Sequence, residues 1–311
     1  MKRYLVLEPW GVYVPFIYLS VVYWLLGGFG LFSFGINHPL FMMLGAYSFY
    51  FGMLQRLFVP AKKYLPFHIA SFIVLLYPSY FSALISSIIV SICLYKSIYD
   101  LLKISNGKLN FPLNFLVLSS PLLSAVSWYL FPINPYYTIP PLIAYILGVN
   151  IGVFTAVLGA RPFFGVRQIP FLLLVVLSYF FPFLIPIIFI VYFIFLFRRG
   201  ISASFTPLLM VTSSLVILFS SYFTHEIIHS FTIGIMTQYF FSCSVYSLAR
   251  YNYKKLYLIS IFAFLSYFIR FMNLPASGLF WMASVLVYLY LVKDAMGIHG
   301  IKYGNSKVFG I

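Results

Sequence analysis

The chain has little charge, and above all few acidic residues. Of its 311 residues, 7% are charged, and four Asp and Glu stand against 19 Lys and Arg. A soluble globular domain has about a quarter of its residues charged, so the composition excludes that class. There are two cysteines, Cys93 and Cys243, which form no C-x-x-C pair and indicate no disulfide framework.

Hydrophobic residues make up 63% of the chain instead. Apolar stretches of membrane-spanning length recur along it and predict a polytopic, all-α transmembrane helical bundle of about twelve spans. We expect one transmembrane domain over residues 1–296 and a short tail over 297–311. Turn and charge signals place the spans at 10–32, 38–59, 64–76, 80–102, 113–131, 140–158, 168–181, 183–196, 203–223, 225–248, 255–271 and 277–292.

The distribution of basic residues predicts the orientation of these spans. If the N-terminus is inside and the spans alternate, every Lys and Arg except Arg270 falls on the inner side. Because inner loops are rich in Lys and Arg, this predicts a plasma-membrane protein with both termini and the 297–311 tail in the cytoplasm. The net charge of +15 then reflects the orientation of the protein in the membrane. We therefore expect no nucleic-acid partner.

The run His225-Glu226-Ile227-Ile228-His229 is the strongest candidate for a functional site. Ionisable groups at membrane depth are costly and usually mark function. In a helix, two histidines four residues apart share a face, and H-E-x-x-H is also the signature of zinc proteases. An intramembrane protease of this kind takes a further Asp ligand from a later span. Here Ala276-Ser277-Gly278 stands where it is expected, so a zinc protease is kept as an alternative only.

The predicted topology places His38, His225, Glu226, His229 and Arg270 at one depth near the outer surface. His38 opens the second span, and Arg270 closes the eleventh. Three histidines at one depth suggest shared metal ligation, since imidazole binds several transition metals.

Two stripes at helical spacing extend inward from these histidines. One runs from His229 to Met236, about 10 Å deeper by helical rise. The other runs from His38 through Gly45 and Gly52. Glycines on the histidine face leave room either for a closely packed helix or for a flat ligand, and both interpretations stay open.

Two segments resemble the NnrS family of haem- and copper-containing membrane proteins, which also has about twelve spans. The late segment His229-Ser230-Phe231-Thr232-Ile233-Gly234 matches the family pattern H-x-x-T-x-G, and Met236, Arg250 and Arg270 follow it. The early segment is similar to the family's histidine-led second span and reads His38-Pro39-Leu40-Phe41-Met42-Met43-Leu44-Gly45. The chain is also similar to the hydrophobic membrane subunit of archaeal b-type cytochrome complexes. The chain has only His38 where the second span of the NnrS family opens with a histidine pair and a Glu. This difference leaves the number of metal centres open.

The resemblance implies a haem b near the outer face with His38 and His229 as axial ligands. His225 would be an alternate ligand or part of a copper site, and Met236 would lie beside the cofactor. Glu226 would orient an imidazole, and Arg270 would pair with Glu226 or a haem propionate.

The implied function is an electron-transfer subunit of a respiratory oxidoreductase. It would relay electrons between membrane quinol and a cytochrome or copper protein on the outer face, with membrane lipid around it. Whether the chain itself catalyses a reaction stays open. The alternatives are a cofactor-free membrane anchor for an extracellular cytochrome and the zinc protease.

Overall fold

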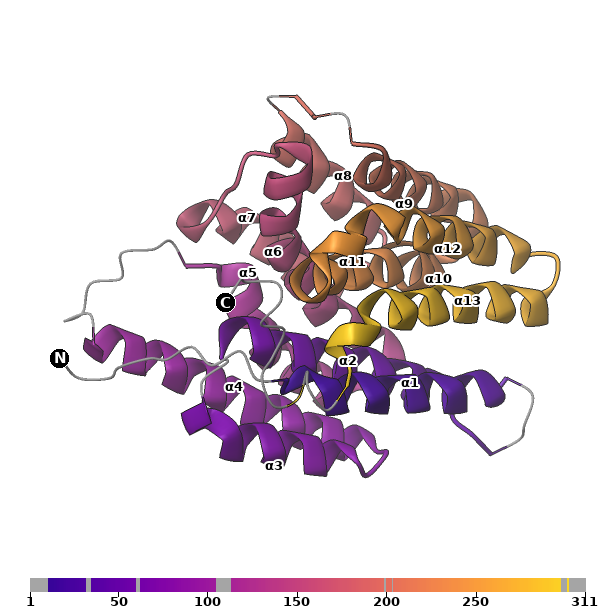
Figure 1. The fold of residues 1–311 in the computed structure, drawn as a ribbon. Coiled ribbons are helices and arrows are strands. Elements are labelled where there is room, and N and C mark those ends of the chain that lie inside the picture. Colours follow the sequence, from indigo (N-terminus) through magenta and orange to yellow (C-terminus); the bar gives the residue numbers. More distant parts are fainter. Residues whose placement is uncertain are drawn as a thin grey trace. The chain divides into compact units, whose positions relative to one another are not determined.

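A computed structural model describes residues 11–31, 35–59, 62–104, 113–198, 200–202, 204–297 and 301. Throughout these residues the regular structure is helical, which confirms the all-α prediction (Figure 1). Each of the twelve predicted spans overlaps a helical segment. These segments are α1 (Tyr13–Phe29), α2 (His38–Phe58), α3 (Leu65–Leu75), α4 (Tyr80–Ile104), α5 (Phe115–Leu130), α6 (Ile139–Leu158), α7 (Ile169–Leu177), α8 (Leu184–Phe197), α9 (Phe205–Thr224), α10 (Ile227–His229) with η4 (Ser230–Met236) and α11 (Thr237–Leu248), α12 (Tyr257–Ile269) and α13 (Leu274–Val292). Most of the 297–311 tail lies outside the described residues.

Asparagine caps account for two of the helix starts. The side chain of Asn37 accepts a hydrogen bond from the Leu40 amide at 3.0 Å, and α2 has a proline in its first turn. Asn273 caps α13 in the same way, with the Ala276 amide as donor at 3.0 Å. The capping oxygen satisfies an amide that has no partner within the helix. The sequence therefore sets these boundaries locally.

Four helical segments of the described residues are long and apolar enough to cross a membrane. They are Tyr80–Lys103, Pro135–Leu158, Phe205–Thr224 and Leu274–Ala295. Five shorter apolar helices accompany them, at Tyr13–Phe29, Leu65–Leu75, Phe115–Leu130, Gly165–Leu177 and Leu184–Phe197. Length and apolar composition together are what a membrane helix requires.

The chain separates into two compact units. Unit 1 comprises Met1–Pro112, Leu118–Pro141 and Asp294–Ile311, and it holds α1 to α4 and most of α5. Unit 2 comprises Leu113–Val117 and Leu142–Lys293, and it holds most of α6 and all of α7 to α13. The expectation of a single domain over residues 1–296 stays a prediction.

In unit 1, glycines allow α1 and α2 to pack closely. A Cβ added at Gly45 would lie 2.4 Å from Cδ1 of Trp24, and one at Gly52 would lie 2.6 Å from Cβ of Phe16. Both partner side chains are buried. The room left by these two glycines is therefore occupied by α1, so close helix packing accounts for them.

In unit 2, side-chain contacts show which helix ends meet. Arg270, at the end of α12, approaches Glu226, which follows the end of α9. At the opposite ends of α9 and α12, the Thr206 side chain donates to the Lys254 carbonyl at 2.7 Å. At the C-terminal end of α13, the Asn252 side chain donates to the Leu291 carbonyl at 2.8 Å.

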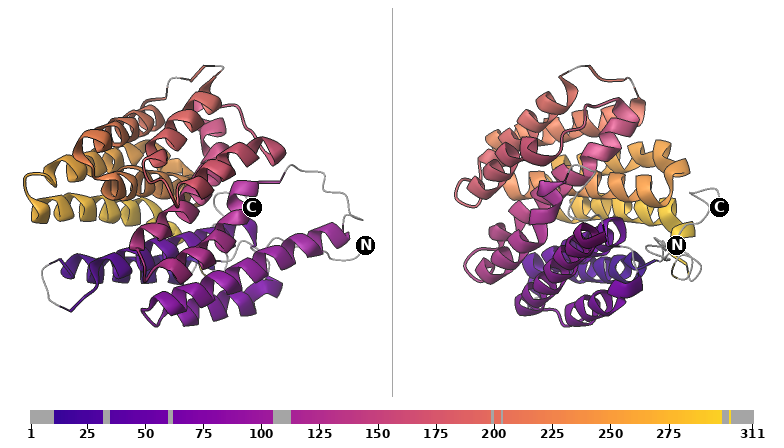
Figure 2. Two further views of the ribbon diagram at one scale, coloured as in Figure 1. Left: turned by 180° about the vertical axis from the view of Figure 1, so that it is seen from behind. Right: turned by 90° about the vertical axis from the view of Figure 1, so that its left-hand side faces the viewer.

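The helices α12 and α13 run side by side (Figure 2). One end of unit 2 therefore gathers Glu226 and Arg270. The other gathers the basic residues Arg250, Lys254, Lys255 and Lys293.

Candidate functional site

The chain breaks its helix at His225, in the middle of the H-E-x-x-H run. Helix α9 ends at Thr224, and His225 has left-handed backbone angles of φ 57° and ψ 18°. Glu226 is also non-helical, and α10 begins only at Ile227. A left-handed residue terminates an α-helix. The prediction that one helix carries His225 and His229 on a shared face is therefore wrong, and the helical zinc-protease geometry is not formed.

Glu226 joins His229 and Arg270 beside this break. Nδ1 of His229 lies 2.7 Å from Oε2 of Glu226, and Nη2 of Arg270 lies 3.5 Å from both carboxylate oxygens. The Glu226 side chain is 34% exposed. Burial raises its pKa, but the hydrogen bond from His229 and the charge of Arg270 outweigh this, and the net pKa is lowered. The cluster thus contains an ionised carboxylate held by two donors.

His229 leads into a π-helix over Ser230–Met236. Its hydrogen bonds join residues five apart, so residues four apart no longer share a face. The predicted stripe from His229 to Met236 assumed α-helical spacing, and in this segment that assumption is wrong. Met236 is buried, with 4% of its surface exposed. Gly234, the last residue of H-x-x-T-x-G, packs against α9, where a Cβ would lie 2.6 Å from Cγ2 of Ile217.

His38 has a comparable arrangement at the start of α2. Its Nδ1 lies 2.7 Å from the backbone oxygen of Gly27, and the side chain is half-buried. A carbonyl oxygen only accepts hydrogen bonds, so Nδ1 is the donor of this pair, and in the neutral ring Nε2 carries the lone pair. His38 belongs to unit 1, whereas His225 and His229 belong to unit 2. Within the described residues, no group of three or more His, Cys, Asp or Glu could hold a metal ion. A shared site of these three histidines stays a prediction.

His68 forms a buried polar cluster that the sequence did not predict. Its Nε2 lies 3.1 Å from the Val59 oxygen, and its Nδ1 contacts Oε1 of Gln55. Nε2 of Gln55 donates to Oγ of Ser71 at 3.2 Å. Both ring nitrogens of His68 are therefore bound by protein groups, which argues for a structural role. The signal was present in the sequence, since Gln55 and His68 are both strongly polar groups, one near the end of α2 and the other near the start of α3.

Comparison of the chain with protein-family models, with curated proteins and with solved structures finds no match. The resemblance to the NnrS family therefore stays a prediction. The arguments for a site rest on the geometry of the histidines and of Glu226 and Arg270.

Proposed function

We propose that the chain is a plasma-membrane protein with about twelve spans and both termini in the cytoplasm. Its apolar helices support this, and so do its exposed side chains: Phe180, Phe223 and Leu279 are each 74% exposed. Exposed apolar groups of this size suit a lipid environment better than water. Basic residues gather at the end of unit 2 that lies away from Glu226. The positive-inside rule requires such an excess of Lys and Arg on the cytoplasmic side.

We further propose that this membrane protein binds haem b and acts as an electron-transfer subunit. One observation carries the proposal: His38 and His229 each have Nδ1 fixed by an oxygen acceptor, the Gly27 carbonyl and the Glu226 carboxylate. Metal-binding histidines almost always donate their second ring nitrogen to a carbonyl or carboxylate in this way. This hydrogen bond fixes the tautomer whose Nε2 lone pair can bind iron.

His38 and His229 would each offer a ring nitrogen to haem iron, and Arg270 would neutralise a propionate. Bound haem supplies one-electron redox chemistry, which suits transfer from membrane quinol to an outer-face cytochrome or copper protein. Imidazole also binds copper, and the exposed His225 beside the cluster is the residue we assign to a copper ion.

Glu226 and Arg270 would tune His229 rather than react. An ionised carboxylate on Nδ1 makes the imidazole a stronger donor at Nε2, which favours the more positive oxidation state of a bound metal. Arg270 keeps Glu226 ionised because its positive charge lies 3.5 Å from the carboxylate oxygens. Half-burial of the cluster limits screening of these charges by water.

A reduced-minus-oxidised absorption spectrum of the purified protein tests the proposal. We expect a b-type haem band that is lost in His38→Ala and in His229→Ala. The haem band should be kept in His225→Ala, which is the matched control because His225 is the exposed neighbouring histidine. Glu226→Gln should keep the band and raise the reduction potential.

A purified protein without any haem band would refute the proposal. If the His38→Ala and His229→Ala variants also assembled with an outer-face cytochrome and supported electron flow as the wild type does, the chain would instead be a cofactor-free anchor.

A further inference from the structure

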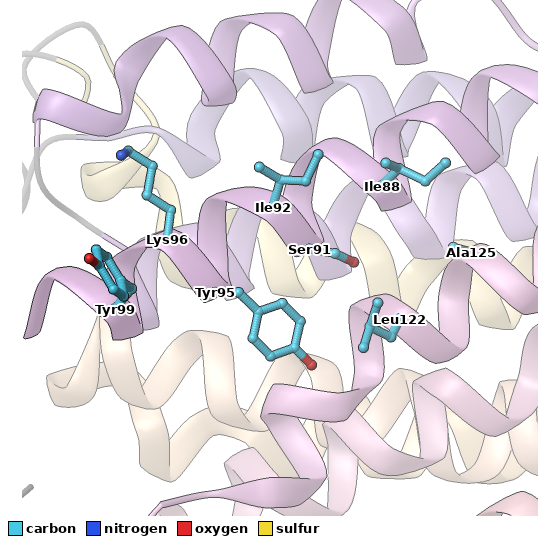
Figure 3. Close-up of a pocket in the computed structure, with 8 residues that line it drawn as sticks. All are labelled: Ile88, Ser91, Ile92, Tyr95, Lys96, Tyr99, Leu122 and Ala125. Atoms are coloured by element: carbon cyan, nitrogen blue, oxygen red, sulfur yellow. The ribbon is translucent and has the colours of Figure 1, made fainter. Parts of the chain in front are cut away.

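An open groove of about 530 Å³ runs between α4 and α5 in unit 1 (Figure 3). Tyr95 bridges its two walls, because its hydroxyl donates to the Leu118 carbonyl at 3.0 Å. The remaining lining is almost entirely apolar along most of its length. The residues that line it are Ile88, Ser91, Ile92, Tyr95, Lys96, Tyr99, Leu122 and Ala125.

The groove changes in character from one end to the other. In Figure 3, Ile88, Leu122 and Ala125 lie toward one end, and the Lys96 amine and the Tyr99 hydroxyl lie at the other. On α4 these positions follow one another at helical spacing, so a single face passes from apolar to basic. A groove of this kind matches a molecule with an apolar chain and a charged head.

The polar end of the groove carries positive charge. Lys96 is exposed, and Lys103, seven residues later, lies on nearly the same face of α4. The nearby acidic residue is Asp100, whose Oδ2 lies 2.9 Å from Nζ of Lys63 and 2.7 Å from the hydroxyl of Tyr64. Because Lys63 offsets the charge of Asp100, the two lysines on the groove face give this end a positive potential.

We propose that the groove binds an anionic phospholipid, with one acyl chain along Ile88, Ile92 and Leu122 and the phosphate at Lys96. The proposed topology places Lys96 on the cytoplasmic side, where anionic lipids are concentrated and basic clusters recognise them. Tyrosine side chains favour the same interfacial depth, which suits Tyr95 and Tyr99. The inference requires the membrane location but is independent of haem binding.

A second groove in the described residues provides an internal comparison. It lies in unit 2, and its lining has no charged residue: Ile190, Leu215, Val216, Phe219, Ser220, Phe223 and Phe268. An acyl chain alone could occupy it, but its lining offers nothing to select a charged headgroup. Selectivity for anionic lipid should therefore depend on Lys96.

Native mass spectrometry of the detergent-purified protein can count the lipid retained. Phosphatidylglycerol and phosphatidylcholine with identical acyl chains would be titrated in separate samples. We expect preferential retention of phosphatidylglycerol. Lys96→Gln should weaken its binding about fivefold, the effect of one basic side chain at a membrane surface. Lys254→Gln, an equal change of charge at an exposed lysine in unit 2, should leave it unchanged.

Two further arms identify what occupies the groove. Ala125→Phe fills the apolar end and should reduce retention of phosphatidylglycerol while Lys96 is intact. Inorganic phosphate should not compete, since it lacks the acyl chain. Equal retention of both lipids by the wild type, unchanged binding in Lys96→Gln or Ala125→Phe, or displacement by inorganic phosphate would each overturn the proposal. Haem content, measured on the same samples, reports separately on the proposed function.

Discussion

Replacing Gly45 with alanine tests whether this glycine is needed for helix packing or for a ligand. The added Cβ would lie 2.4 Å from Cδ1 and 2.5 Å from Nε1 of Trp24. Trp24 is 2% exposed, stacks on Phe49 with ring centroids 6.1 Å apart, and donates to the Met42 carbonyl at 3.2 Å. The indole therefore has little freedom to move away.

The expected cost follows from the size of this clash. Overpacking of a well-packed core costs about 1–3 kcal/mol. Displacing Trp24 from the Met42 carbonyl would add about 0.5–1.5 kcal/mol. The better helix propensity of alanine offsets about 1 kcal/mol. We therefore expect Gly45→Ala to lower the free energy of unfolding by about 0.5–3.5 kcal/mol, combining these ranges.

Equilibrium unfolding in mixed micelles, followed by circular dichroism of the helices, measures this change. Gly28→Ala is the matched control, because nothing lies within 4 Å of a Cβ at that position of α1. It should be neutral or up to about 1 kcal/mol more stable. Trp24→Phe should remove part of the clash, so its effect combined with Gly45→Ala should be smaller than the sum of the single effects.

Two outcomes would refute this reasoning. If Gly45→Ala unfolded like Gly28→Ala, α1 would not pack against Gly45 as the structure places it. If Gly45→Ala also lost a haem band at unchanged stability, the glycine would serve a flat ligand.

Three further predictions concern other contacts. Glu226→Gln should be less stable than the wild type at neutral pH. Because the pKa of Glu226 is lowered in the folded protein, its stabilising effect is present above the ordinary value of 4.5 and is lost as the pH falls through the folded pKa. Melting temperatures of the two proteins should therefore converge on acidification, and a difference independent of pH would contradict this. Gly234→Ala should cost about 1–3 kcal/mol by overpacking against Ile217. An added Ile217→Ala should recover part of this cost, whereas Gly152→Ala, with nothing within 4 Å, should not destabilise the protein. Asp100→Asn should cost at most about 1 kcal/mol, since the Lys63 side chain is 46% exposed and exposed ion pairs contribute little. A larger loss in denaturant unfolding would show that the Tyr64 hydrogen bond dominates.

The helices were predictable from the sequence because their determinants are local. Asn37 and Asn273 cap α2 and α13 by binding amides only three residues further along the chain, although the predicted last span began at residue 277, inside α13. Apolar stretches bounded by proline, glycine and charge located the remaining helical segments to within a few residues.

The candidate site was only partly predictable. The expected topology placed Glu226, His229 and Arg270 at one depth, and the structure brings them into one cluster. The left-handed His225 and the π-helix after His229 were not foreseen, because H-E-x-x-H is equally compatible with a continuous helix. Near this break, the Thr224 hydroxyl lies 3.1 Å from that of Tyr267 on α12, a contact that no local pattern reveals.

The sequence by itself determined the helical class, the positions of the helices and the presence of helices long and apolar enough to cross a membrane. Hydrophobicity and capping act between residues close in the chain, so they can be followed along it. Only the tertiary structure decided that α1 occupies the space at Gly45, that Ile217 occupies the space at Gly234, and that Arg270 meets Glu226. These contacts join residues 17 to 44 positions apart, as with Ile217 and Gly234 or Glu226 and Arg270. Spacing along one helix cannot specify which side chain of another helix will fill a gap or meet a charge.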